Sequence, residues 1–116
     1  MIVEDDPDTR DMLERFLELE GFQVRTAANG QLALDALQQD SALCVILLDL
    51  MMPVMNGWQF RQAQASDPRL AGIPVVVVTA AGSKEDIPAI DADGWLSKPV
   101  DFDRLLATIV PLCDRV

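Results

Sequence analysis

Short apolar runs alternate with longer amphipathic segments along the chain. The runs at residues 1–3, 44–48 and 75–78 are rich in aliphatic side chains, which is typical of strands covered on both faces. Apolar and polar residues alternate from Phe22 to Thr26, a pattern that predicts a half-buried strand. A short apolar segment, Gly94–Leu96, predicts the last strand. We therefore expect five strands.

The segments between these strands carry apolar residues at helical spacing. Asp6 followed by proline is a favourable helix start, and Gly21 is a favourable stop. Asn29 precedes a second helix, residues 58–65 predict a third, and Asp101 is expected to cap the last one. Strands and helices that alternate in this way predict a parallel sheet with helices on both faces.

The segment between the fourth and fifth strands departs from this pattern. Pro88 falls where the fourth helix should run, and proline inside a helix breaks it. We expect residues 83–88 to form a short or irregular helix, or only a turn.

Composition narrows the class of protein. Half of the 116 residues are hydrophobic and 24% are charged, as in a single globular domain. The formal net charge of −10 disfavours direct binding of nucleic acid, because phosphate groups would be repelled. No apolar run reaches the about 18 residues of a membrane span, and the acidic start at residues 1–6 does not resemble a signal peptide. A cytoplasmic protein is expected.

The two cysteines allow two interpretations. Cys44 lies within an apolar run and is expected to be a small buried side chain. A disulfide with Cys113 is the alternative, but nothing in the sequence indicates an oxidising compartment.

Polar residues follow the predicted strands. Glu4 and Asp5 follow the first strand, Asp49 the third, Thr79 the fourth and Lys98 the fifth. Ligands of open α/β sheets bind beyond the carboxyl ends of the strands, and a strand order of 2-1-3-4-5 would bring these side chains together. Crowded carboxylates favour a hard divalent cation such as Mg²⁺, and a carboxylate can also attack phosphorus. This combination favours phosphoryl transfer.

The residues at these strand ends resemble the receiver domains of response regulators of the chemotaxis-regulator type. The resemblance covers essentially the whole chain, with the motifs in the family's order. It implies one receiver domain over residues 1–116, with a flavodoxin-like, doubly wound, five-stranded parallel sheet in the order 2-1-3-4-5. The matching motifs are Ile2-Val3-Glu4-Asp5-Asp6, Leu47-Leu48-Asp49-Leu50-Met51-Met52-Pro53 with Asn56-Gly57, Val78-Thr79-Ala80, and Lys98-Pro99.

The resemblance implies a role for each matching residue. Asp49 corresponds to the phosphoacceptor and is also expected to bind Mg²⁺. Asp5 would bind the ion directly, Glu4 would act through water, and Met51 would contribute its backbone carbonyl.

Three further residues correspond to the phosphate-contacting and switching positions. Thr79 matches the switch hydroxyl, and Lys98 matches the lysine that contacts the phosphate. Trp95 occupies the place of the family's switch aromatic, although an aromatic here also suits the core. The resemblance implies a cis peptide bond between Lys98 and Pro99.

The implied function is that of a phosphoacceptor in a two-component system, not of an enzyme. Its donors would be a sensor histidine kinase or phosphotransfer protein or, more slowly, a small acyl phosphate. The protein would assist its own phosphorylation and dephosphorylation. The sequence does not name the output partner, does not distinguish a monomer from a homodimer, and is compatible with a stand-alone receiver or a fragment of a larger regulator or hybrid kinase.

Three other functions compete with this interpretation. A Mg²⁺-dependent phosphatase with an aspartate nucleophile needs a second Asp two residues further on, where this chain has Met51. A flavodoxin-like cofactor binder needs a phosphate-binding loop after the first strand, where Glu4-Asp5-Asp6 would repel phosphate. A non-phosphorylated interaction module would not respond to a phosphoryl mimic.

Overall fold

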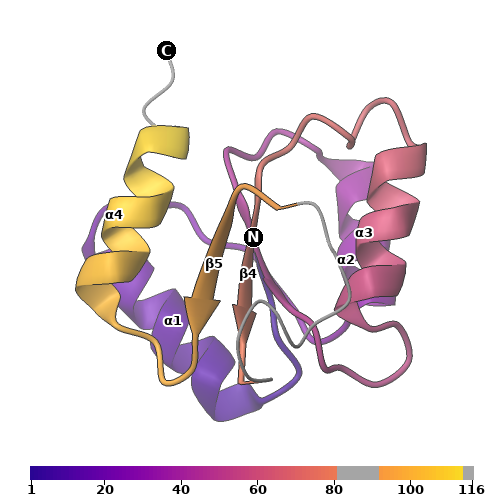
Figure 1. The fold of residues 1–116 in the computed structure, drawn as a ribbon. Coiled ribbons are helices and arrows are strands. Elements are labelled where there is room, and N and C mark those ends of the chain that lie inside the picture. Colours follow the sequence, from indigo (N-terminus) through magenta and orange to yellow (C-terminus); the bar gives the residue numbers. More distant parts are fainter. Residues whose placement is uncertain (81–91, 114–116) are drawn as a thin grey trace.

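One parallel sheet organises the described residues, which are 1–80 and 92–113 of the computed structural model. Its strand order is β2-β1-β3-β4-β5, which confirms the predicted doubly wound arrangement (Figure 1). The strands are β1 (Ile2–Val3), β2 (Thr26–Ala27), β3 (Ile46–Asp49), β4 (Val75–Thr79) and β5 (Gly94–Ser97). The helices of the described residues are α1 (Pro7–Leu19), α2 (Gly30–Gln39), α3 (Gly57–Ser66) and α4 (Phe102–Cys113).

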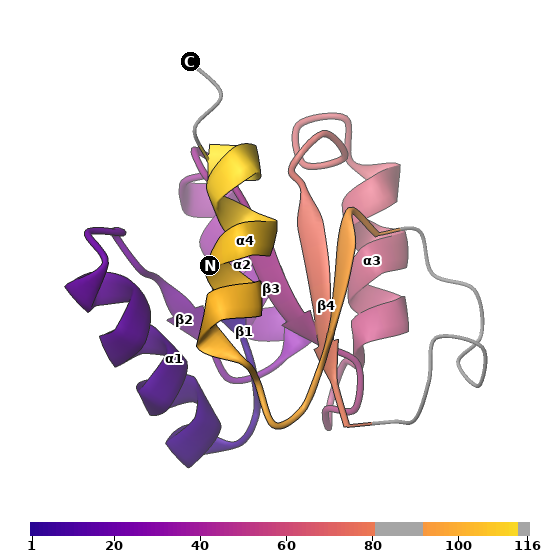
Figure 2. The ribbon, with the colours of Figure 1, turned by 60° about the vertical axis from the view of Figure 1, so that its left-hand side comes forward.

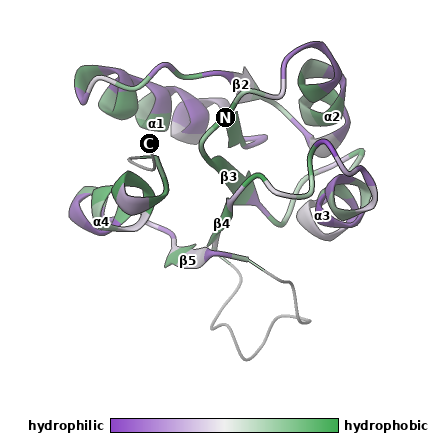
Figure 3. Cartoon of the chain, turned by 90° about the horizontal axis from the view of Figure 1, so that it is seen from above, coloured by the Kyte–Doolittle hydropathy of each residue, from purple (hydrophilic) through white to green (hydrophobic). Residues whose placement is uncertain are grey.

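Helices cover both faces of the sheet. Helices α1 and α4 lie on one face, and α2 and α3 lie on the other (Figures 2 and 3). Neighbouring strand residues alternate between the two cores, because side chains along a strand point to opposite faces. Leu47 packs in the core with α1 and α4, whereas Leu48 packs in the core with α2 and α3. The continuous apolar character of β3 and β4 follows from this burial on both faces.

Short polar side chains cap the starts of the helices, at the predicted positions for α1 and α2 and one residue earlier than predicted for α3. Asp6 accepts a hydrogen bond from the backbone N–H of Thr9, and Asn29 accepts one from the N–H of Leu32. Asn56 forms a reciprocal capping box with Gln59 at the start of α3. These bonds satisfy N–H groups that have no partner inside the helix.

The second strand is shorter than its sequence pattern predicts. Only Thr26 and Ala27 are paired, and Thr26 is exposed although the alternation placed it on the buried face. A parallel strand needs a partner, and β1 offers two residues for pairing with β2. The residues before Thr26 are not part of the strand, although the carbonyl of Arg25 accepts a hydrogen bond from the backbone N–H of Ile2.

The prediction for Cys44 as a buried side chain is wrong. Cys44 is exposed and forms a disulfide with Cys113. Strand β3 starts at Ile46, which pairs with Val75. Cys44 lies before that pairing begins, so its apolar neighbours in the sequence do not indicate burial.

The segment between β4 and β5 was predicted to form a short or irregular helix, or only a turn, around Pro88. This segment falls within residues 81–91, outside the described residues.

Among the described residues, no helix combines the length and apolar character required to cross a membrane.

Gly57, the first residue of α3, allows the loop after β3 to close tightly. A Cβ atom there would lie 2.7 Å from Leu50 Cα and 2.8 Å from the backbone oxygen of Asp49. We expect Gly57→Ala to lower the free energy of unfolding, measured by urea denaturation, by about 1–3 kcal/mol because backbone must move.

Gly72→Ala is the matched control. A Cβ atom at Gly72 would have no neighbour within 4 Å, so the free energy of unfolding should change by less than about 0.5 kcal/mol. Equal decreases in the free energy of unfolding of the two variants would show that the close backbone approach at Gly57 does not contribute to stability.

Candidate functional site

The pairing of β1 with β3 brings two carboxylates together. The register aligns Val3 with Leu48, so the residues that follow, Glu4 and Asp49, lie beside each other at the carboxyl edge of the sheet. Both are buried, with exposed fractions of 2% for Glu4 and 5% for Asp49. Two adjacent acidic side chains with little access to water repel each other unless a positive charge is close.

Lys98, which directly follows β5, supplies that positive charge. Its Nζ atom lies 2.6 Å from Glu4 Oε1 and 3.6 Å from Asp49 Oδ2. The backbone N–H of Lys98 donates to the carbonyl of Thr79 at 3.0 Å, which ties the residue after β5 to the end of β4. The peptide bond between Lys98 and Pro99 is cis, as the family resemblance implied.

Burial and charge shift the protonation of this cluster. Burial raises the pKa of Glu4 to about 7; its contact with Asp49 adds to this, and Lys98 opposes it. Burial disfavours the charge of Lys98, but the hydrogen bond with Glu4 and the charge of Asp49 outweigh it and raise the Lys98 pKa above its usual value. Glu4 therefore holds a proton more readily than an ordinary carboxyl group, while Lys98 stays positively charged.

Three carboxylates at this edge meet the requirements of a cation site. Glu4, Asp5 and Asp49 each offer an oxygen, and these oxygens lie within 4.8 Å of one another. Asp5 is exposed, so the group is open to solvent on one side. Carboxylate oxygens are hard ligands, and a divalent cation would relieve the repulsion between these grouped carboxylates. The donor set therefore fits a hard divalent metal ion.

The loop after β3 orients the Asp49 carboxylate. The backbone N–H of Met51 donates to Asp49 Oδ1 at 3.3 Å, while the Met51 side chain is 61% exposed. Gly57 donates its N–H to the carbonyl of Leu50, so the loop is fastened to the start of α3. One Asp49 oxygen thus faces the loop and the other faces Lys98.

Comparison with known proteins identifies this arrangement. The model of the response regulator receiver domain family matches residues 1–110. The chain belongs to this family. The response regulator Rre1 of Synechocystis sp. is 40% identical over 119 residues, which cover 99% of this chain and 51% of that protein. The DNA-binding dual master transcriptional regulator RpaA of the same organism is 37% identical over 121 residues, which cover 99% of this chain and 48% of RpaA.

A solved structure supports the same conclusion. The chemotaxis protein CheY4 of Vibrio cholerae is 33% identical, with a TM-score of 0.85, over 96% of this chain and 94% of that one. The described residues therefore have the receiver fold, and the chain spans about half the length of these two curated relatives.

The predicted site residues lie at or near one edge of the receiver domain. Glu4, Asp49 and Lys98 are in direct contact, and the buried Thr79 is joined to Lys98 through the backbone. Trp95 is partly buried and packs against the core formed with α2 and α3. This contact agrees with the core alternative and leaves its switch role a prediction.

Sequence reasoning missed Arg10. Its guanidinium donates to the backbone carbonyl of Glu4 at 2.9 Å from the first turns of α1. This bond fastens the end of β1, where Glu4 and Asp5 turn toward the site. The sequence did contain a signal for this contact. Arg10 is the first basic residue of the chain and lies one helical turn after the Asp6 cap, close to the acidic residues that follow β1.

The raised pKa of Glu4 predicts how the stability of the metal-free protein depends on pH. Its pKa is about 7 in the folded protein and near 4.5 in the unfolded chain, so the folded state binds more protons between these values. This contribution to the free energy of unfolding is fully present below pH 4.5 and declines as the pH rises toward 7. Urea denaturation with a chelator present measures the slope.

Glu4→Gln is the control for this pH dependence, because the amide does not titrate. Its free energy of unfolding should decline less steeply between pH 4.5 and 7 than that of the unchanged protein. Identical slopes would mean that Glu4 does not titrate in this range.

Proposed function

We propose that residues 1–116 act as one receiver domain that accepts a phosphoryl group on Asp49. The observation that carries this proposal is the buried Asp49 carboxylate at the carboxyl edge of the sheet, with the Lys98 ammonium 3.6 Å from its Oδ2 atom. An oxygen nucleophile and a cation that faces it are what phosphoryl transfer requires. Asp49 is thus the acceptor, and the other site residues assist it.

The transfer forms a bond between an Asp49 carboxylate oxygen and phosphorus and breaks the bond from phosphorus to the donor. Lys98 lies where the transferred group would carry negative charge, and its raised pKa keeps it protonated as a compensating cation. The N–H of Met51 holds Asp49 Oδ1 and limits the rotation of the nucleophile. The product is an aspartyl phosphate, which water later hydrolyses.

Mg²⁺ is the proposed cofactor, because the three carboxylates and a nearby backbone carbonyl match its preference for oxygen ligands. Asp5 and Asp49 would bind it directly, Glu4 through water, and Met51 with its backbone carbonyl. When bound, the ion would offset charge on the phosphoryl oxygens. Glu4 would then be deprotonated, since the positive charge of the ion opposes the effect of burial that raises the pKa of Glu4.

Thr79 and Trp95 are the proposed switch residues. Thr79 ends β4 beside Lys98, and its hydroxyl could donate to a phosphoryl oxygen on Asp49. Trp95 lies on β5, two residues before the strand ends, and packs toward α2 and α3. A movement of Thr79 toward phosphate would be passed to β5 through the paired strands, whose register aligns Thr79 with Ser97.

The proposed donor is a sensor histidine kinase or a phosphotransfer protein in the cytoplasm. The protein assists its own phosphorylation and dephosphorylation but does not turn over other substrates. RpaA is described as DNA-binding, and this chain matches 48% of it. With a net charge of −10, the receiver itself is not expected to bind nucleic acid and would act through an output partner.

A phosphatase with an aspartate nucleophile is the weaker candidate. It needs an acid/base two residues after the nucleophile, and the Met51 side chain at that position is apolar and exposed. An apolar side chain cannot protonate a leaving alcohol. The geometry therefore favours a stable acceptor over a catalyst of repeated hydrolysis.

Beryllofluoride tests the phosphoacceptor, because it mimics a phosphoryl group bound to a carboxylate. With Mg²⁺ present, it should bind the unchanged protein, and Asp49→Asn should abolish binding because the amide cannot form that bond. Fluorine NMR detects the bound species. Asp35→Asn, the same change at an exposed carboxylate of α2, should bind as the unchanged protein does. Binding retained by Asp49→Asn would refute the assignment.

Removal of the Asp5 carboxylate tests the metal ligands. Asp5→Asn should weaken Mg²⁺ binding by at least about tenfold in isothermal titration calorimetry, because a direct anionic ligand is lost. Asp8→Asn removes the same charge from an exposed residue in the first turn of α1 and should change the affinity less than about twofold. Similar losses in the two variants would indicate nonspecific attraction instead of coordination.

A further inference from the structure

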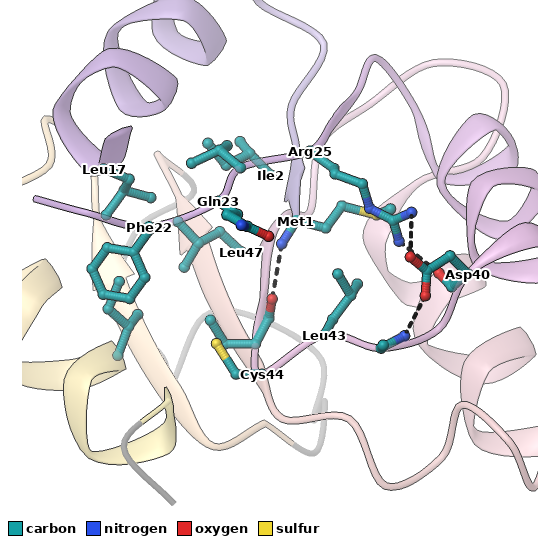
Figure 4. A pocket seen from close by; sticks show the side chains of 14 residues that line it. Met1, Ile2, Leu17, Phe22, Gln23, Arg25, Asp40, Leu43, Cys44 and Leu47 are labelled. Atoms are coloured by element: carbon teal, nitrogen blue, oxygen red, sulfur yellow. Dashed lines mark hydrogen bonds and ion pairs between the residues drawn. The ribbon is translucent and has the colours of Figure 1, made fainter. Parts of the chain in front are cut away.

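The disulfide between Cys44 and Cys113 joins two parts of the fold that are far apart in the sequence. Cys44 lies in the bend before β3, and Cys113 is the last residue of α4. Their Cα atoms are 4.9 Å apart, although 69 positions separate them in the sequence. Figure 4 shows Cys44 next to Leu43 at the border of a cavity near the amino end of the sheet.

Packing holds the end of α4 less firmly than its middle. Leu105 and Ile109 are buried against the sheet, whereas Leu112 is only partly buried where it packs on the same core. Pro111 lacks the backbone N–H that would continue the hydrogen-bond ladder, so the last turn is weak. The bond from Cys113 to Cys44 therefore fastens a helix end that its own sequence loosens.

The pair is accessible to small thiols. Cys44 is exposed and Cys113 is partly buried. A surface hollow of about 360 Å³ borders both cysteines, with Pro74 and Leu112 also in its lining. Accessible disulfides exchange with thiols, whereas disulfides enclosed in a core do not.

We propose that Cys44 and Cys113 are a reversible redox modification site, whose reactant is a low-molecular-weight disulfide of the glutathione class. In oxidation, one cysteine thiolate attacks the small disulfide and releases one small thiol. The second cysteine then attacks the mixed disulfide and releases the other. Two cysteine sulfurs lose two electrons in total, the small disulfide gains them, and the two thiol protons end on the two released thiols.

The consequence of oxidation is a fixed end of α4. In the dithiol state the last turn, with Pro111, is held only by weak packing and opens more often. In the disulfide state a loop of 69 positions is closed, which restricts the unfolded chain and stabilises the fold. The site thus couples redox conditions to the face of the receiver formed by α4.

This inference does not depend on the proposed phosphorylation. Cys44 precedes β3, whereas Asp49 ends it, so the two sites lie at opposite edges of the sheet. We expect beryllofluoride to bind the oxidised and reduced forms with the same affinity within about twofold, because no atom of the acidic site contacts the disulfide. Failure of phosphoryl-mimic binding in both forms would concern Asp49 and not the cysteines.

Thiol labelling of the folded protein tests the exchange. After incubation with oxidised glutathione and then iodoacetamide, mass spectrometry should find both cysteines unlabelled and linked to each other. After reduced glutathione, both should be labelled, and re-oxidation should restore the link. Free thiols after oxidation, a bond that reduced glutathione leaves intact, or persistent glutathione adducts would each overturn the proposal.

The effect on α4 is measured by thermal unfolding and amide hydrogen exchange. The oxidised protein should unfold at a temperature higher by roughly 10 °C than the reduced protein, with slower exchange at the end of α4. The Cys44→Ser/Cys113→Ser variant should behave like the reduced protein under both conditions. Equal unfolding temperatures and equal exchange in the oxidised and reduced unchanged protein would refute the coupling, and this comparison needs no variant.

Discussion

The parallel pairing of β1 with β3 forces two carboxylates into contact, and the chemistry of this receiver depends on that constraint. Glu4 and Asp49 cannot separate without breaking the strand register that aligns Val3 with Leu48. Burial, with a smaller contribution from Asp49, raises the pKa of Glu4 to about 7, and the grouped carboxylates make the edge attractive to cations. Lys98, the residue after β5, supplies part of the compensating positive charge. A metal ion would bind to the grouped carboxylates, and a phosphoryl group would be attracted to the metal ion and to Lys98.

The sheet can hold these grouped charges at its edge because apolar cores cover both of its faces. Leu47 and Leu48 lie in different cores, one with α1 and α4 and the other with α2 and α3. Burial of the strands by both helix layers offsets the unfavourable grouping of charges at the strand tips. Asp49 thus ends a strand that is buried on both faces, and Lys98 follows the neighbouring part of the same sheet.

The two ends of β3 have different chemistry. At its carboxyl end, Asp49 takes part in an ionic cluster that responds to protons and cations. At its amino end, the disulfide of Cys44 joins the strand to the end of α4. The acidic cluster and the disulfide therefore lie near opposite ends of one strand.

Local chemistry in the sequence determined much of this structure. A cap such as Asp6 acts on a residue three positions away, and the two-sided apolar strands are visible in short windows, so helix starts, strand positions and the family motifs were predictable. Only the tertiary structure decided which distant groups touch. The bond between Lys98 and Glu4 spans 94 positions, the hydrogen bond of Arg10 to Glu4 depends on how α1 leaves β1, and Cys44 is exposed because pairing begins two residues later. These outcomes depend on strand register and packing, which are non-local properties that no short window of sequence contains.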